Sequence, residues 1–154
     1  MKNSLTNKER TEEYLKKFDR EKVLKFLVKD NSPVIFDVGA NIGVYSIYAA
    51  LRKPKAIVCA FEPEYSNLHQ LKMNIINNDL LNNVITFAIA LSDQTGVSYL
   101  HIQDLTPGAA LSTEHRESIN KTFGKDVVWK EGVGTSTLDY ISENLDIQPN
   151  LIKI

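Results

Sequence analysis

The stretch Val34–Ala50, VIFDVGANIGVYSIYAA, decides the fold expected for this chain. An apolar run over Val34–Val38 contains one acid and is followed by two glycines four residues apart, after which helical spacing begins. A short continuous apolar run is typical of a buried strand. A glycine loop lets backbone approach a ligand closely, and the first N–H groups of the next helix lack intrahelical partners. The stretch therefore predicts a strand, a loop that can hold a small charged molecule, and a helix over Val44–Arg52.

The same alternation continues along the chain. Apolar runs predict strands over Ala56–Phe61 and Val84–Ala90, and helical spacing predicts a helix over Ser66–Asn77 between them. Continuous apolar strands that alternate with helices indicate a parallel sheet covered on both faces. We therefore expect an α/β fold.

The flanking regions differ from this pattern. Helical spacing before Pro33 predicts an N-terminal helical segment over residues 1–32, and the proline ends it. After Ser92 we expect half-exposed strands, a helix capped by Ser136, and a terminal buried strand in LIKI; these lie at Val97–Ile102, Asp126–Glu131, Thr137–Leu145 and Leu151–Ile154. The predicted organisation is one helical segment followed by one domain over residues 33–154.

Composition excludes several classes of protein. The 154 residues are 43% hydrophobic and 24% charged with a net charge of −1, so no basic field favours nucleic acid. No apolar run is long enough to span a membrane, and the N-terminus lacks the hydrophobic region of a secretory signal, so we expect a cytoplasmic chain. The single cysteine, Cys59, lies in an apolar run and is expected to be buried and inert.

The glycine loop does not fit two well-known phosphate motifs. A P-loop needs Lys followed by Ser or Thr after its last glycine, whereas Gly43 is followed by Val44 and Tyr45. A dinucleotide fingerprint that starts at Gly39 would have Asn41 in place of its second glycine. The loop therefore indicates another ligand.

Two acids suggest which ligand. Asp37, at the end of the first strand, would repel a pyrophosphate but attract the ammonium and sulfonium of S-adenosylmethionine. Glu62 follows the second strand directly, so it should emerge at the same sheet edge, where a carboxylate can accept both ribose hydroxyls. A structural alternative is that Asp37 and Asn41 only cap the helix and the turn.

The residues quoted so far, with later blocks, resemble a known family. IFDVGANIGVYSIYAA, AFEPEYSNLHQLKMNI, ITFAIALSDQTGVSYLHI, TSTLDYI and LIKI resemble, in this order, the FkbM family of class I methyltransferases. The resemblance runs from about Phe26 to Ile154. It implies a Rossmann-like, three-layer fold with a mostly parallel sheet, and S-adenosylmethionine-dependent O-methylation of a sugar or natural-product hydroxyl, without nucleic acid.

The resemblance also implies a set of cofactor-binding residues. The loop residues would surround the methionine end, Glu62 would bind the ribose beside Pro63, and a later segment would flank the adenine. The full set is Asp37, Gly39, Ala40, Asn41, Gly43, Glu62, Pro63, Ala90, Leu91 and Ser92. No metal ligand is expected.

The family continues after LIKI with an Asp-Val-Glu-Gly segment and further strands, which this sequence does not contain. We therefore expect a fold incomplete at the C-terminus, either as a fragment or with a partner chain that supplies the rest. Two alternatives follow: a non-catalytic S-adenosylmethionine-binding fragment, and a nicotinamide-dependent oxidoreductase that uses the same acid at Glu62.

No catalytic residue is nominated. Methyl transfer to oxygen needs an oriented acceptor and, for a poor nucleophile, a general base. Each candidate is more typical of a structural position: His69, His101 and His115 of the surface or of packing, Asp139 of the first turn of its helix, and Trp129 of the core.

Overall fold

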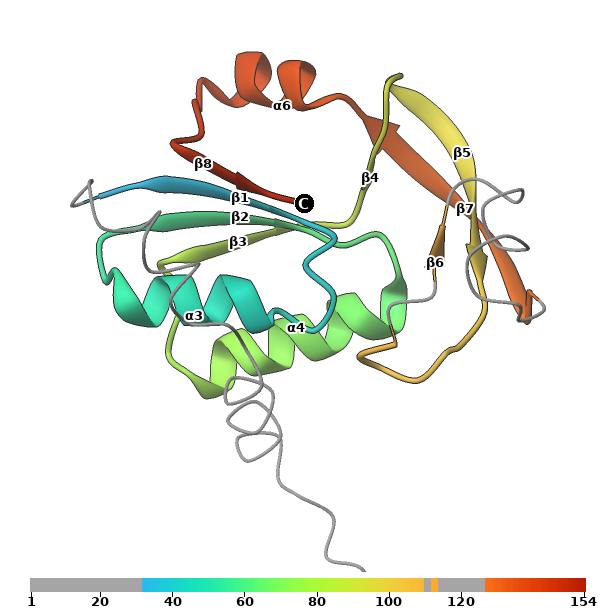
Figure 1. Cartoon of the computed structure of the whole chain (residues 1–154), viewed down its shortest axis with the longest axis horizontal. Helices are drawn as coiled ribbons and strands as arrows, with labels where there is room; N and C mark the ends of the chain where they lie inside the picture. Colours follow the sequence, from blue (N-terminus) through green and yellow to red (C-terminus); the bar gives the residue numbers. More distant parts are fainter. Residues whose placement is uncertain (1–31, 110–111, 114–126) are drawn as a thin grey trace, which may run out of the picture.

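The computed structural model describes residues 32–109, 112–113 and 127–154 (Figure 1). The predicted N-terminal helical segment lies outside these residues apart from Ser32, and so does His115. None of the helices in the described part is long and apolar enough to cross a bilayer.

The centre of the fold is a four-stranded parallel sheet. It contains β1 (Val34–Val38), β2 (Ile57–Phe61), β3 (Val84–Phe87) and β8 (Leu151–Lys153), in the order β3-β2-β1-β8. The strands predicted after Pro33, after Lys55 and in LIKI are therefore confirmed, with small shifts at their ends.

Helices cover both faces of this sheet. Helices α3 (Val44–Arg52) and α4 (Tyr65–Asn77) lie on one face, and α6 (Leu138–Leu145) lies on the other (Figure 1). One core packs Ile47 and Leu71 of the helices against Val58, and the opposite core contains Phe36, Cys59, Phe61 and Ile141. The three-layer α/β fold with a parallel sheet is thus confirmed.

Cys59 is fully buried in the central layer. Burial raises the pKa of its thiol to about 11, since the thiolate would lose its hydration. The prediction of a buried cysteine is confirmed.

The strand order places a topological switch point between β1 and β8. From β1 the chain moves outward to β2 and β3 and then returns to pair β8 with the other side of β1. In doubly wound sheets, ligands bind in the crevice outside the carboxyl ends of the strands at such a reversal. Val38 and Lys153, at the ends of β1 and β8, therefore border the position where a ligand is expected.

A second four-stranded sheet packs beside the first, with the order β4-β7-β5-β6 (Figure 1). Its strands are β4 (Ala90–Leu91), β5 (Gly96–Ile102), β6 (Ser112–Thr113) and β7 (Trp129–Ser136). The central pair, β5 and β7, is antiparallel from Gly96 opposite Thr135 to Ile102 opposite Trp129.

Four sequence predictions need correction here. The single strand expected over Val84–Ala90 is divided, because β3 ends at Phe87 and Ala90 already pairs with β7 in the other sheet. The strand expected over Asp126–Glu131 lies instead at Trp129–Ser136. Trp129, expected in the core, is 56% exposed. The cap of α6 is Thr137 rather than Ser136, since the Thr137 hydroxyl accepts the N–H of Tyr140 at 3.1 Å.

Candidate functional site

The loop between β1 and α3 contains three left-handed residues. Gly39, Asn41 and Gly43 have φ values of 63°, 54° and 87°. Glycine adopts this conformation without steric cost, and Asn tolerates it better than most residues. The loop is held from within by the N–H of Gly43, which donates to the Ala40 carbonyl at 2.8 Å.

The two glycines of the loop serve different purposes. A Cβ on Gly39 would meet no atom within 4 Å, so this position needs glycine for its conformation and leaves open space above the backbone. A Cβ on Gly43 would lie 2.2 Å from Cδ1 of Leu71, so this glycine also permits close packing of the loop on α4.

Glu62 follows β2 and borders a cavity of about 200 Å³, which we call the Glu62 cavity. The cavity is lined by Gly39, Asn41, Glu62, Pro63, Asn67, Leu100 and Ala109. The Glu62 carboxylate accepts the backbone N–H of Asn41 at 2.7 Å and that of Glu64 at 2.9 Å. These bonds fix the carboxylate at the cavity wall.

Burial is the main influence on the protonation of Glu62. The side chain is 5% exposed, and desolvation raises its pKa above the ordinary value of 4.5. The two backbone hydrogen bonds oppose this rise, while the nearby Glu64 adds to it by like-charge repulsion.

The segment between β5 and β6 forms part of the wall of the same cavity. The buried Asn67 of α4 accepts the N–H of Gly108 at 2.8 Å and donates to the carbonyl of Ala109 at 3.4 Å. Asn41 donates to the same Ala109 carbonyl at 3.2 Å. The segment after β5 is thus tied both to the glycine loop and to α4.

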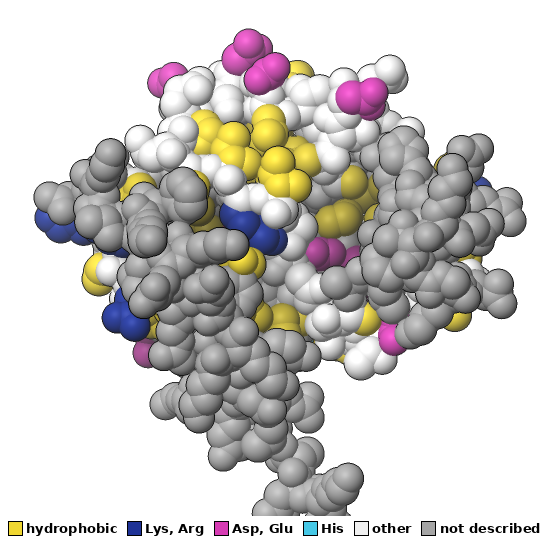
Figure 2. Space-filling model, in the orientation of Figure 1, with side chains coloured by type: hydrophobic (Ala, Val, Ile, Leu, Met, Phe, Trp, Pro, Cys, Tyr) yellow, Lys and Arg dark blue, Asp and Glu magenta, His cyan; other side chains and the backbone are white. Residues whose placement is uncertain are grey.

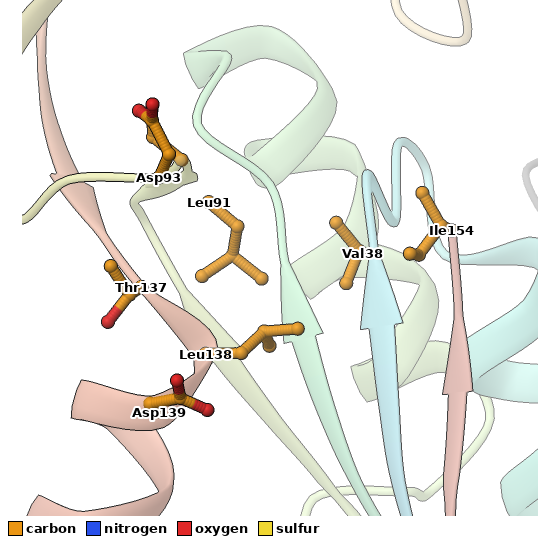
Figure 3. Close-up of a pocket in the computed structure, with 8 residues that line it drawn as sticks. Val38, Leu91, Asp93, Thr137, Leu138, Asp139 and Ile154 are labelled. Carbon is orange, nitrogen blue, oxygen red and sulfur yellow. The ribbon is translucent and has the colours of Figure 1, made fainter.

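A larger cavity, of about 510 Å³, lies at the carboxyl end of β1 on the side of α6; we call it the switch-point cavity (Figure 3). Figure 3 shows Asp93, Thr137 and Asp139 along one wall and Val38 and Ile154 on the opposite wall. Its lining is Val38, Leu91, Ser92, Asp93, Thr137, Leu138, Asp139 and Ile154.

The surface around α6 is hydrophobic in one part and acidic in another. On the face seen in Figure 2, hydrophobic side chains gather below α6, and acidic side chains lie on the helix itself. Asp139 and Glu143 are the exposed acids within α6. The lining of the switch-point cavity likewise combines apolar side chains with carboxylates and hydroxyls.

Asp37 lies in neither cavity. It is 1% exposed, and its carboxylate accepts the Ser46 hydroxyl at 2.7 Å and forms an ion pair with Lys153 at 3.0 Å. The expected meeting of Asp37 and Glu62 at one cavity is therefore not seen, because Asp37 points under the loop toward α3.

The structure divides the predicted cofactor residues into three groups. Four of them line the Glu62 cavity: Gly39, Asn41, Glu62 and Pro63. Two line the switch-point cavity: Leu91 and Ser92. The remaining four line neither: Asp37, Ala40, Gly43 and Ala90. Ala40 and Gly43 instead shape the loop through its backbone bonds.

Sequence reasoning missed three residues of this region. Asn67 lies in the predicted helix Ser66–Asn77 and Ala109 lies after the predicted strand Val97–Ile102, and nothing in their spacing indicates that they meet. Lys153 lies in the predicted LIKI strand, but its place beside Asp37 depends on the register in which β8 pairs with β1, which the sequence does not indicate.

Other candidates lie away from the cavities or inside the packing. His69 is exposed on α4 and stacks on Tyr65, with ring centroids 6.3 Å apart, while His101 is buried in β5. Within the described ranges, no three His, Cys, Asp or Glu side chains gather closely enough to hold a metal ion.

Comparison with known proteins gives a consistent family match. Residues 37–154 match the family described as Methyltransferase FkbM domain. Over 106 residues, 69% of this chain and 40% of the relative, the chain is 35% identical to Methyltransferase sdnD of Sordaria araneosa. It is 39% identical over 64 residues to the 31-O-demethyl-FK506 methyltransferase FkbM of Streptomyces tacrolimicus, which covers 42% of this chain and 24% of that protein.

The chain thus spans 40% or less of the length of these two relatives. Among solved structures, M. jannaschii TYW2 in complex with AdoMet is 31% identical, with a TM-score of 0.38 over 44% of this chain and 31% of that chain.

Proposed function

Because the chain belongs to the FkbM family of methyltransferases, we propose that it binds S-adenosylmethionine and serves methyl transfer to a hydroxyl of a sugar or natural product. The observation that carries this proposal is the family match over residues 37–154, which includes both the glycine loop and Glu62. The relative from Streptomyces tacrolimicus is named for methylation of the oxygen at position 31 of demethyl-FK506, which supports a hydroxyl acceptor.

The residues of the site fit this cofactor chemically. A buried carboxylate at a cavity wall suits a ribose, because the Glu62 oxygens can accept hydrogen bonds from its two hydroxyl groups. Gly39 leaves open space where any other residue would place a Cβ, so a ligand can approach the backbone there. Together these features support the ribose position proposed at Glu62.

The switch-point cavity suits the remaining part of the ligand. Leu91 and Ser92 border it, and these residues are proposed to flank the adenine. Val38 lines this cavity and the next residue, Gly39, lines the Glu62 cavity, so both cavities border the end of β1. A ligand with several chemical parts can therefore be held on both sides of that strand end.

When bound, S-adenosylmethionine supplies a methyl group on a positively charged sulfur, which is an activated leaving group. The protein then has to orient the acceptor and exclude water.

Isothermal titration calorimetry with adenosylhomocysteine tests the proposal. We expect binding to the native chain and a loss of about tenfold or more in Glu62→Gln, because the amide nitrogen cannot accept a ribose hydroxyl. Glu143→Gln, an exposed position on α6, is the matched control and should bind like the native chain. Equal affinities in all three proteins would contradict the assignment of Glu62.

A second titration separates the alternatives. A nicotinamide-dependent oxidoreductase would bind NAD through the same carboxylate and would not bind adenosylhomocysteine. A binding fragment without activity would bind adenosylhomocysteine yet transfer no methyl group to any hydroxyl acceptor. Binding of NAD alone would overturn the proposed function.

A further inference from the structure

Lys153 is held at the topological switch point by three oxygen atoms. Its ammonium lies 3.0 Å from the Asp37 carboxylate, 3.1 Å from the Val38 carbonyl and 3.2 Å from the Gly39 carbonyl. The ammonium donates hydrogen bonds to the two backbone carbonyls, and its contact with the Asp37 carboxylate is an ion pair. The ring of Tyr45 lies 4.8 Å from the same nitrogen.

The position of Lys153 follows from the register of the sheet. Asp37 and Lys153 are direct partners on the parallel strands β1 and β8, and this is the last pair of that ladder. The Lys153 side chain therefore extends the connection between the strands to Val38 and Gly39, where the backbone ladder has ended.

The contact also fixes one peptide of the glycine loop. The Gly39 carbonyl points to Lys153, and the N–H of the same peptide, on Ala40, donates to the Phe61 carbonyl at 2.9 Å. The next N–H, on Asn41, donates to Glu62. Lys153 is thus linked to the Glu62 carboxylate through two consecutive peptides of the loop.

Stability alone does not explain such a pair. Replacing both partners of a buried ion pair by neutral residues is often nearly neutral, whereas removal of one partner leaves an uncompensated charge. Asp37 is 1% exposed and Lys153 25%, so the pair lies mostly away from water. Its value lies in the geometry that it imposes on the loop.

We infer that Lys153 is a positioning residue for the methyl-donor site, which holds the glycine loop so that the Asn41 N–H orients Glu62. This inference rests on the proposed function and assigns Asp37 a different role from direct contact with a ligand cation. Asp37 is the counter-ion of Lys153, and its effect on ligand affinity passes through the shape of the loop.

The test compares four variants with the native chain. They are Lys153→Met, Asp37→Asn, the double variant of both, and Lys72→Met as a control with the same charge change at an exposed site on α4. The measurements are the midpoint of thermal unfolding, amide hydrogen exchange of Ala40 and Asn41 without ligand, and calorimetric affinity for adenosylhomocysteine.

We expect Lys153→Met to lower the unfolding midpoint, because it leaves the buried Asp37 carboxylate without its counter-ion. The double variant should recover most of this loss. Its loop amides should still exchange about tenfold faster than in the native chain, and its affinity should remain about tenfold weaker, which corresponds to about 1.4 kcal/mol. Lys72→Met should match the native chain in all three measurements.

A double variant with native exchange and native affinity would overturn the inference, because Lys153 would then serve only to neutralise the charge of Asp37. If the native chain binds no adenosylhomocysteine, the proposed function fails, and the exchange rates of the unliganded variants still decide the role of Lys153. If Lys153→Met alone does not fold, the amide exchange and the affinity of the double variant decide the inference.

Discussion

At the scale of single residues, the two glycines of the loop should respond differently to a methyl group. Gly43→Ala would strain the left-handed backbone and would also place a Cβ 2.2 Å from Leu71. We therefore expect it to lower the free energy of unfolding by about 3 kcal/mol. Gly39→Ala meets open space and should cost about 1 kcal/mol from its backbone conformation alone. Urea unfolding of both variants measures the difference, and equal losses would contradict the packing role of Gly43.

Glu62 should give the chain a characteristic dependence of stability on pH. Its pKa is raised in the folded chain, so its favourable contribution is complete below the ordinary value of 4.5 and is lost as the pH rises through the higher folded value. The free energy of unfolding of the native chain, relative to Glu62→Gln, should therefore decrease across that interval. Urea titrations from about pH 4 to pH 8 measure it.

The matched control for this titration is Glu143→Gln on the surface of α6. Its stability should run parallel to that of the native chain at every pH. Parallel curves for Glu62→Gln as well would mean that burial does not raise the pKa of Glu62.

The positions of the two acids at the ends of strands could be predicted from the sequence, but the residues that contact them could not. Glu62 could be placed at a sheet edge because it follows an apolar strand directly, and it borders a cavity there. Asp37 forms an ion pair with Lys153, which lies more than a hundred residues later in the chain, and the sequence around Asp37 does not indicate this partner. The pattern of residues along a strand does not indicate which side chains from distant segments will form an ion pair.

At the scale of elements, the start of α4 depends on an unusual cap. The Glu64 carboxylate accepts the N–H groups of Ser66 at 2.8 Å and Asn67 at 2.7 Å, and its side chain is 3% exposed. Glu64→Ala should lower the free energy of unfolding by about 1–2 kcal/mol, because two N–H groups of the first turn lose their acceptor.

A comparison with Glu64→Gln isolates the role of charge in this cap. The amide oxygen can still accept one N–H group, so the loss should be smaller than in Glu64→Ala. Removal of the Glu64 charge should also lower the pKa of Glu62, because repulsion from Glu64 contributes to its rise. Urea unfolding that gives equal stability for Glu64→Ala and the native chain would refute the cap.

The elements of the first sheet were predictable because their signal is local. Apolar runs and helical spacing located β1, α3, β2, α4 and β8 within a few residues. The second sheet was harder, since β7 contains Gly132 and Gly134, which disfavour strands, and it is stabilised by pairing with β5 from Trp129 to Thr135. The apolar run after Asn83 contains no turn residue where the chain passes from β3, which ends at Phe87, to β4, which begins at Ala90 in the other sheet.

At the scale of the whole molecule, the sequence order explains where the site forms. The chain builds β1, β2 and β3 outward and returns to β8 on the other side of β1, so the loop after β1 lies at the reversal. The second sheet is inserted before this return, between β3 and β8, and Leu100 of β5 and Ala109 of the segment after it line the Glu62 cavity. The site therefore depends on segments from both sheets.

Cys59 offers a measure of the stability of this whole assembly. It is the single cysteine of the chain, lies fully buried in the central strand β2, and has a thiol pKa of about 11. A thiol reagent should therefore modify the native chain only through unfolding. If the proposed cofactor site is present, adenosylhomocysteine at about 100 times its dissociation constant should slow the modification about 100-fold, corresponding to about 2.7 kcal/mol.

The reaction rate is followed by the absorbance of the chromophore that the reagent releases when it reacts with the thiol. The urea-denatured chain is the reference for an accessible thiol. Glu62→Gln at the same ligand concentration should show a smaller slowing, because its site is less occupied. Rapid modification of the native chain without denaturant would instead show that β2 opens locally. In that case the two layers of helices would not unfold together with the central sheet, and ligand protection would report on that strand alone.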